Sequence, residues 1–227
     1  MHRERTIPAA CLVLTAACLC AAASASVVQG ESSAPSKEST ARGDGFRRAI
    51  RPEEMSAQDR RMLALAQAAA KECSAVLERA IDQGAISEEE FFSALYFPIQ
   101  PVTTPPTFTT FYDGYTDKFI TPIEDRILSR DKEALFVTLV DANGYVPSHN
   151  SRYAQPATGD PLLDIKRRRT KRIFNDTTGF YASRHAQGVL IQLYRRDTGD
   201  TIADLAVPVA VKGRHWGVVR VGYVRKS

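Results

Sequence analysis

Turn signals near the C-terminal end constrain the fold of this chain more than any other feature. Asn143-Gly144, Thr198-Gly199-Asp200 and Lys212-Gly213 each stand between two apolar runs. Residues of these types adopt the positive φ at which two antiparallel strands reverse direction. Several strands joined by such short turns predict one compact antiparallel sheet.

The runs beside these turns have the length and composition of β-strands. We predict five strands, over residues 134–140, 145–149, 189–194, 202–211 and 216–224. The first is almost continuously apolar, as expected for a central strand that is covered on both faces. The sequence therefore predicts that residues 134–140 share one antiparallel sheet with the last two strands.

Helical patterns fill the region before the strands. A proline and two acids at Pro52-Glu53-Glu54 begin a long amphipathic helix that ends near Gly84. Ser87 caps a short second helix, and a third is predicted over residues 117–129. Residues 150–188 are polar and rich in turns, with one short helix near residues 162–168. The predicted fold class is α+β, in a single domain over residues 52–227.

The N-terminus predicts export. Charged residues 2–5 precede an apolar stretch, and Ala23-Ser24-Ala25 offers the small residues that a signal peptidase requires. We therefore predict a signal peptide over residues 1–25 and a periplasmic location; an uncleaved anchor and a lipid anchor at Cys18 are the alternatives. Residues 26–51 have the Ser-, Gly-, Glu- and Lys-rich composition of a disordered tether. Cys73 is then the one cysteine of the mature chain, so no internal disulfide forms.

The charge pattern argues against a nucleic-acid partner. The formal net charge is only +4, although residues 166–172 hold six cations. Exported proteins rarely meet nucleic acid, and a run of charges is commonly a solvated face.

The sequence contains no local motif of an enzyme. His149, His185 and His215 do not fall at the spacings of helical metal motifs, and P-loop, G-x-S-x-G and C-x-x-C-H patterns are missing. We predict no catalytic residue, no metal and no cofactor. Two alternatives stay open: an exported enzyme or metal-binding protein whose site is built from distant residues, and an interaction protein without a ligand.

Several strings in the second half resemble the Cache-type sensor region of bacterial methyl-accepting chemotaxis proteins. They are D-A-N-G-Y-V-P-S-H-N from Asp141, R-T-K-R-I-F-N-D from Arg169, Q-L-Y-R-R-D-T-G from Gln192 and G-R-H-W-G from Gly213. The resemblance implies a PAS-like fold, in which a long N-terminal helix lies beside a five-stranded antiparallel sheet that carries a ligand pocket.

In those receptors a membrane helix and a signalling coiled coil follow the sensor region, whereas this sequence ends at Ser227. We therefore expect a small-molecule sensor or binding domain without its own signalling module. A membrane-bound signalling protein is its expected partner, and the N-terminal helix could pair with a second copy.

Candidate ligand-binding residues lie in these strings or just after the first of them and are Tyr145, His149, Asn150, Tyr153, Arg169, Arg172 and Tyr194. An arginine in a pocket binds a carboxylate through two hydrogen bonds, so a small carboxylate is the expected ligand. The alternative interpretation is structural, with His149 hydrogen-bonded, the tyrosines in the core and the arginines paired with Asp176. Trp216 is predicted to be core.

Overall fold

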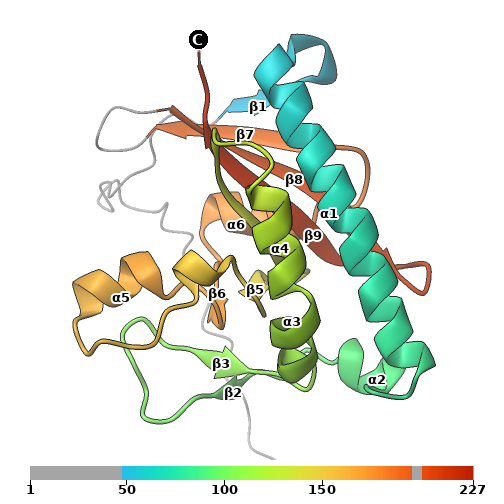
Figure 1. Ribbon diagram of the computed structural model, residues 1–227, viewed down its shortest axis with the longest axis vertical. Coiled ribbons are helices and arrows are strands. Elements are labelled where there is room, and N and C mark those ends of the chain that lie inside the picture. The colour runs from blue at the N-terminus through green and yellow to red at the C-terminus, as the bar shows by residue number, and fades with distance from the viewer. Residues whose placement is uncertain (1–47, 196–200, 227) are drawn as a thin grey trace, which may run out of the picture. The chain divides into compact units, whose positions relative to one another are not determined.

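The computed structural model of the protein describes residues 48–195 and 201–226 (Figure 1). Every described residue belongs to one compact unit. The predicted signal peptide, most of the predicted tether and the turn at Thr198-Gly199-Asp200 lie outside the described residues. In the part of the chain that the structure describes, no helix is long and apolar enough to cross a membrane.

A five-stranded antiparallel sheet forms the centre of the fold. Its strands lie in the order β1 (Arg48–Ile50), β7 (Leu190–Arg195), β8 (Thr201–Val211), β9 (Arg214–Val224) and β4 (Ala134–Asp141). All four pairings are antiparallel. The α+β, PAS-like architecture that the sequence predicts is confirmed, including the pairing of β4 with β9 and of β9 with β8. The prediction that residues 134–140 form a central strand was wrong: β4 is the edge strand, and its apolar residues are buried by the elements that cover both of its faces.

One of the five predicted strands was wrong. Residues 145–149 do not join the main sheet: only Tyr145–Val146 is a strand (β5), and it pairs with β6 (Arg172–Ile173). The fifth strand is β1, which pairs with β7 and was assigned to the tether. Three residues carry too short a pattern to predict a strand, so β1 forms through its contact with the distant edge of the sheet.

The long helix α1 (Ala57–Asp82) begins where its sequence provides a cap. The Ser56 side chain accepts a hydrogen bond from the Asp59 backbone N–H, and the Asp59 carboxylate accepts one from the Ser56 N–H. This reciprocal cap fixes the first turn of the helix. A short 3₁₀ turn, η1 (Pro52–Glu54), precedes it in the chain. Apolar residues of α1 pack against β8, β9 and β4, and Cys73 is among the buried ones, as predicted.

Short elements complete the description of the chain. They are α2 (Glu88–Phe91), β2 (Phe97–Pro98), β3 (Phe108–Thr109), α3 (Asp113–Phe119), α4 (Thr121–Leu128), η2 (Ser151–Tyr153), α5 (Pro161–Arg167) and α6 (Thr177–Ser183). The predicted third helix is thus two helices that meet at Ile120. The helix α6 was not predicted.

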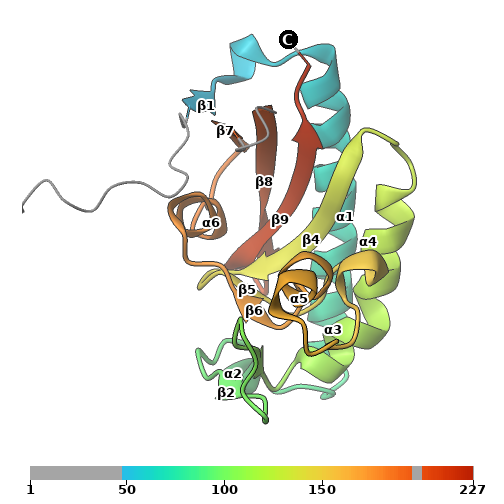
Figure 2. The same cartoon turned by 90° about the vertical axis from the view of Figure 1, so that its left-hand side faces the viewer.

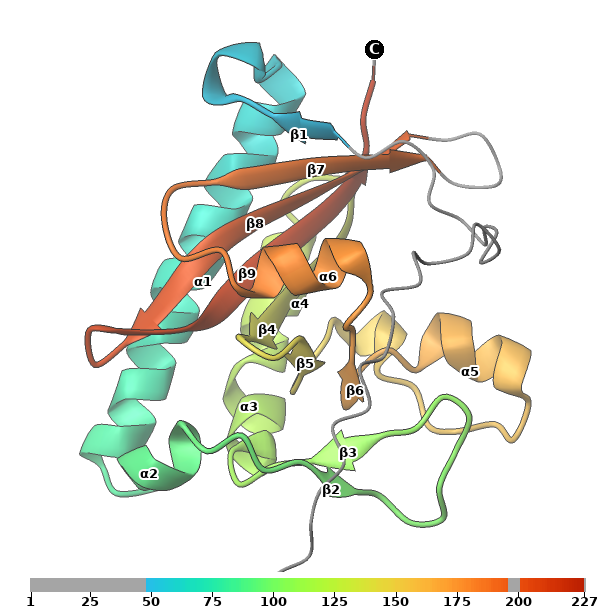
Figure 3. The same cartoon turned by 180° about the vertical axis from the view of Figure 1, so that it is seen from behind.

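The two faces of the sheet are covered differently. Figure 2 shows α1 and α4 on one face and α6 on the other, and Figure 3 shows α6 crossing the strands. The α1 face holds most of the core, where Trp216 stacks on Phe91 with ring centroids 5.3 Å apart. Trp216 is therefore core, as predicted. A smaller apolar cluster on the α6 face consists of Val140, Val146, Ala182, Ala206 and Val218.

The predicted turns form where the structure describes them. Gly144 has φ +84°, and Lys212 and Gly213 have φ 52° and 73°. The second pair joins β8 to β9 in the two-residue turn that matches the right-handed twist of the strands.

Candidate functional site

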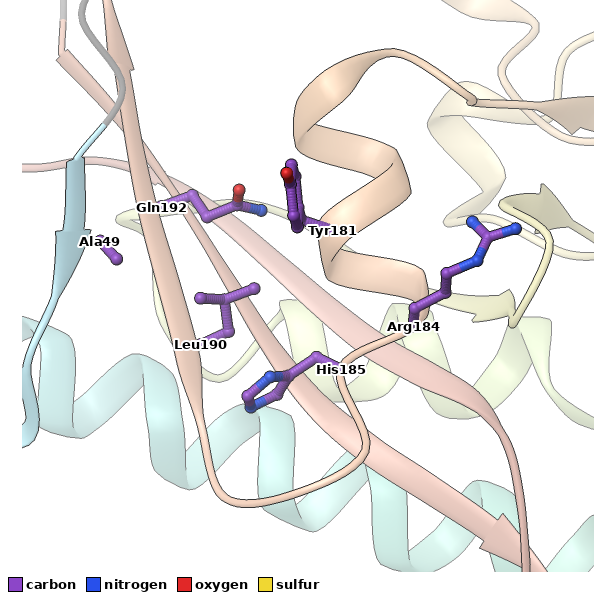
Figure 4. A pocket seen from close by; sticks show the side chains of 6 residues that line it. All are labelled: Ala49, Tyr181, Arg184, His185, Leu190 and Gln192. Atoms are coloured by element: carbon purple, nitrogen blue, oxygen red, sulfur yellow. The ribbon is translucent and has the colours of Figure 1, made fainter.

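The candidate site is a pocket on the sheet face that α6 covers (Figure 4). Its volume is ≈ 460 Å³, and its lining residues are Ala49, Tyr181, Arg184, His185, Leu190 and Gln192. Ala49 lies opposite Gln192 in the pairing of β1 with β7, and Leu190 is two residues before Gln192. Paired residues and residues two apart in a strand share a face, so these three form the sheet wall.

The second wall is α6, which its own sequence positions. Asp176 caps the helix by accepting a hydrogen bond from the Gly179 N–H at 3.1 Å. A Cβ at Gly179 would lie 2.5 Å from the Phe174 carbonyl oxygen, so only glycine allows this close approach. Ala182 is buried against the sheet, while Tyr181 and Arg184 are exposed at the rim.

Gln192 connects the two walls. Its side chain is buried, and its Nε2 donates a hydrogen bond of 2.9 Å to the Thr178 carbonyl of α6. Figure 4 shows Gln192 and Leu190 projecting from β7 toward the helix. The sheet wall is therefore apolar at Leu190 and polar at Gln192.

The pocket offers a cation and a neutral imidazole. The Arg184 guanidinium lies 3.9 Å from the centroid of the Phe180 ring, a cation–π contact that holds it at the rim. Burial and the neighbouring His215 lower the pKa of His185, so its ring is neutral near pH 7. Its buried Nε2 has no hydrogen-bond partner among the described residues.

A row of buried polar side chains continues across the same sheet face. Asp204 lies directly opposite Gln192, and Arg220 pairs with the Asp204 carboxylate through its Nε at 3.1 Å. Thr138 of β4 lies opposite Arg220. A buried ion pair contributes little net stability, because both charges must leave water. Three buried polar side chains, Gln192, Asp204 and Thr138, and the partly buried Arg220 thus occupy the sheet face beside the pocket.

His149, a predicted ligand contact, lies beside this row. Its ring contacts Tyr153, with centroids 4.9 Å apart, and Phe136, whose ring covers Gly222 on the same sheet face. Burial lowers the pKa of His149 well below its usual range, and Arg169, Arg220 and Arg152 lower it further. The ring is therefore neutral. Its Nδ1 is buried and has no partner among the described residues.

Asn150 fastens the loop that carries His149. Its Oδ1 accepts a hydrogen bond from the Val137 backbone N–H at 2.8 Å, within the first half of β4. Ser148, in the same loop, donates a hydrogen bond from its hydroxyl to the buried Glu124 carboxyl of α4 at 3.1 Å. Both side chains hold the loop against β4 and α4.

The structure brings some of the predicted residues together. Arg169 and Arg172 lie over the Phe174 ring, at 5.1 and 4.7 Å from its centroid. The Arg169 backbone N–H donates to the Tyr153 carbonyl, beside His149. Burial and the neighbouring Arg169 lower the pKa of Arg172 to about 10. Asp176, the predicted acidic partner of these arginines, caps α6.

Tyr145 lies apart from this group. Its hydroxyl donates to the Asp113 carboxylate at 2.8 Å, and its ring packs against Tyr96 and Tyr112 in the larger core. The side chain of Tyr194 lies outside the described part of the chain. Of the predicted residues whose side chains are described, none lines the pocket.

The sequence carried two signals for the pocket that the prediction did not use. One was the helix cap D-T-T-G at Asp176, which begins α6. The other was Gln192, a polar residue inside an apolar strand. Ala49 had no signal, because β1 forms only through tertiary pairing.

Comparison with known proteins leaves the family open. No protein-family model and no curated protein matches the chain. Among solved structures, an extracellular ligand-binding receptor from Desulfohalobium retbaense is similar at 16% identity and a TM-score of 0.30, over 72% of this chain and 25% of that one. The ligand-binding domain of the Pseudomonas aeruginosa amino acid chemoreceptor PctC, in complex with GABA, is similar at 17% identity and a TM-score of 0.26, over 74% of this chain and 65% of that one.

The chain thus spans a quarter of the first protein and less than two thirds of the second. Membership of the Cache family stays a prediction from the sequence.

Proposed function

We propose that the domain is a sensor that binds a small organic molecule in the pocket between α6 and the sheet. The observation that supports this proposal most directly is the pocket itself, whose volume of ≈ 460 Å³ falls in the range of sites for small ligands. The imidazole of His185 and the amide of Gln192 lie beside the apolar side chain of Leu190, and the cation of Arg184 lies at the rim; such a combination orients a ligand while removing it from water.

A carboxylate is the ligand that this proposal favours. Arg184 is the one charged residue of the pocket lining, and its planar guanidinium pairs with carboxylates. The polar row of Gln192, Asp204 and Arg220 lies on the same sheet face, and the loop residue His149 lies beside it. The predicted residues His149, Asn150, Tyr153, Arg169 and Arg172 would then form a second zone of contact for a longer ligand.

The cellular setting belongs to the proposal as well. Export by residues 1–25 would place the sensor in the periplasm, where a membrane-bound protein would receive its signal. N-terminal sequencing of the protein from the periplasm tests this part: a chain that begins near Ser26 agrees with it, and a chain that retains Met1 contradicts it.

A catalytic or metal role has less support. Among the described residues, no group of three or more His, Cys, Asp and Glu side chains lies close enough to hold a metal ion. His185 and His215 are neighbours, but they supply only two nitrogen ligands, and structural zinc requires four ligands.

The test is a ligand screen followed by calorimetry. Thermal shift against organic acids, amino acids and purines identifies a ligand, because a bound ligand stabilises the fold by mass action. Binding is then measured for Gln192→Leu, Tyr181→Ala and Arg184→Ala, and for His149→Ala and Arg169→Ala.

Arg60→Ala is the matched control, because Arg60 is exposed on α1 and forms no ion pair among the described residues. We expect the Gln192 and Tyr181 variants to weaken binding at least about tenfold, and Arg184→Ala to make it less sensitive to salt. Loss of binding only in the His149 and Arg169 variants would place the site at the sequence-predicted residues. Unchanged binding in all five folded variants would contradict both locations.

A further inference from the structure

The short helix α5 has an inverted arrangement of polar and apolar side chains. Asp164 is 6% exposed, whereas Leu162 is 72% exposed, Leu163 40% and Ile165 42%. A helix on the surface of a globular protein normally turns its apolar stripe toward the core. In α5 the acid points inward, and the leucines and the isoleucine face water.

Specific hydrogen bonds hold this orientation. The Asp164 carboxylate accepts hydrogen bonds from the Thr158 backbone N–H and hydroxyl, both at 2.8 Å. At the start of the helix, the Asp160 carboxylate accepts hydrogen bonds from the backbone N–H groups of Leu162 and Leu163. Both acids are therefore engaged in fixing the helix, and rotation of α5 to bury its apolar side chains would break the bonds of Asp164.

Cations lie beside the exposed apolar residues. Lys166 and Arg167 are exposed at the end of α5, and neither has an acidic partner in the described part of the chain. By contrast, the next lysine, Lys171, is enclosed by Asp113 and Asp117. The positive charge next to the apolar cluster is thus left unneutralised at Lys166 and Arg167.

The position of α5 leaves this surface accessible. Figures 1 and 3 show α5 at the edge of the fold on the side away from α1, and Figure 1 shows it near β3. The helix is joined to that region through Arg168, whose Nη2 donates to the Thr107 hydroxyl at 3.4 Å. We define the α5 patch as Leu162, Leu163, Ile165, Lys166 and Arg167.

We infer that the α5 patch docks on an anionic lipid surface. Exposed apolar side chains on a helix insert at the boundary between headgroups and acyl chains, and adjacent lysines and arginines pair with anionic headgroups. The charge of the patch fits this partner, since two unpaired cations stand beside three apolar side chains. This inference is independent of the ligand proposed for the pocket, because no residue of the patch lines it.

The experiment is co-sedimentation with lipid vesicles. The full chain is used. Vesicles of phosphatidylcholine alone are compared with vesicles that also contain phosphatidylglycerol. We expect binding only to the anionic vesicles, and we expect added salt to reverse it.

Two double variants separate the apolar and the charged contributions. Lys166→Gln with Arg167→Gln should weaken binding by about 25-fold, because each basic residue near an anionic surface contributes about fivefold. Leu162→Ser with Ile165→Ser should also weaken binding, without altering the thermal stability, since both residues are exposed. The matched controls are Arg60→Gln with Lys71→Gln on α1, which remove the same charge, and Leu95→Ser, another exposed apolar residue.

Three results of the binding experiment would overturn the inference. They are equal binding to neutral and anionic vesicles, an equal loss of binding in the control variants, and an absence of binding to either vesicle. A further contrary result is a dimer in sedimentation velocity that the Leu162 and Ile165 changes convert to a monomer, since the patch would then be covered by a second copy of the chain.

Discussion

Asp59, in the first turn of α1, forms an ion pair with Arg225, which directly follows the last strand, at 2.8 Å. Asp59 is fully buried, and it also accepts a hydrogen bond from the Tyr223 hydroxyl at 2.6 Å. The pair therefore fastens the beginning of the long helix to the end of β9. Two segments that are far apart in the sequence are held at one end of the sheet.

Loss of Arg225 is expected to destabilise the fold strongly. Arg225→Ala leaves a buried carboxylate without its cation, which should reduce the free energy of unfolding by roughly 2 to 4 kcal/mol. Chemical denaturation measures this change. The control is Lys226→Ala, which removes an exposed pair with Glu133 and should cost less than about 1 kcal/mol. Equal effects of the two substitutions would contradict the role given to Asp59.

Asp59 should also make stability depend on pH in acid. Burial alone raises its pKa, but hydrogen bonds from Arg225, Tyr223 and Ser56 outweigh this effect and hold the pKa at about 2. The unfolded chain therefore takes up the proton first, and this part of the stability is lost as the pH falls from about 4 to about 2. Asp59→Asn should flatten the acid limb of a stability–pH curve.

Glu124 should make stability depend on pH in the opposite direction, near neutral pH. Burial raises its pKa to about 8, although hydrogen bonds from the Leu139 N–H and the Ser148 hydroxyl lower it in part. The folded state thus holds a proton that the unfolded state releases, so stability falls as the pH rises from about 4 to about 8. Glu124→Gln keeps the acceptor oxygen and removes the ionisation.

Denaturation curves at about pH 5 and about pH 9 test this prediction. We expect Glu124→Gln to be more stable than the wild type at the higher pH and close to it at the lower one. Glu89→Gln, at an exposed position, should show no such difference. A wild-type protein whose stability does not change over this range would contradict the raised pKa.

Substitution of two glycines by alanine is expected to change stability in opposite directions. A Cβ at Gly217 would lie 2.1 Å from the Val140 carbonyl oxygen and 2.7 Å from the Asp141 Cα, so β9 and β4 would have to separate. Gly217→Ala should cost about 1 to 3 kcal/mol or more. Gly114 in α3 has open space around it, and Gly114→Ala should stabilise by about 0.5 to 1 kcal/mol. Thermal unfolding of both variants gives the comparison.

The Asn150 side chain is expected to stabilise the fold whether or not a ligand is bound. Asn150→Ala removes the acceptor of the buried Val137 N–H on the edge strand β4, which should cost about 1 to 3 kcal/mol. The exposed Asn175→Ala serves as the control and should change little. If Asn150→Ala were as stable as the control, the loop would be held by other contacts.

Local chemistry made much of the fold predictable. The turn at Lys212-Gly213 and the cap at Ser56 depend on a few neighbouring residues, and the strands of residues 202–224 are two mainly apolar runs on either side of that turn. Such features follow from backbone sterics and short-range hydrogen bonds, so the sequence determined the long helix, four of the five strands of the antiparallel sheet and the class of the fold.

Tertiary contacts decided the rest. Strand β1 exists because Arg48–Ile50 meets the free edge of β7, and β5 pairs with β6 instead of extending the main sheet. The pocket brings together Ala49, the end of α6 and the start of β7, and its shape depends on how closely Gly179 approaches Phe174. The sequence could name His149 and the arginines as polar residues of interest. Which groups share a cavity depends on the packing of distant segments, and no local pattern encodes that.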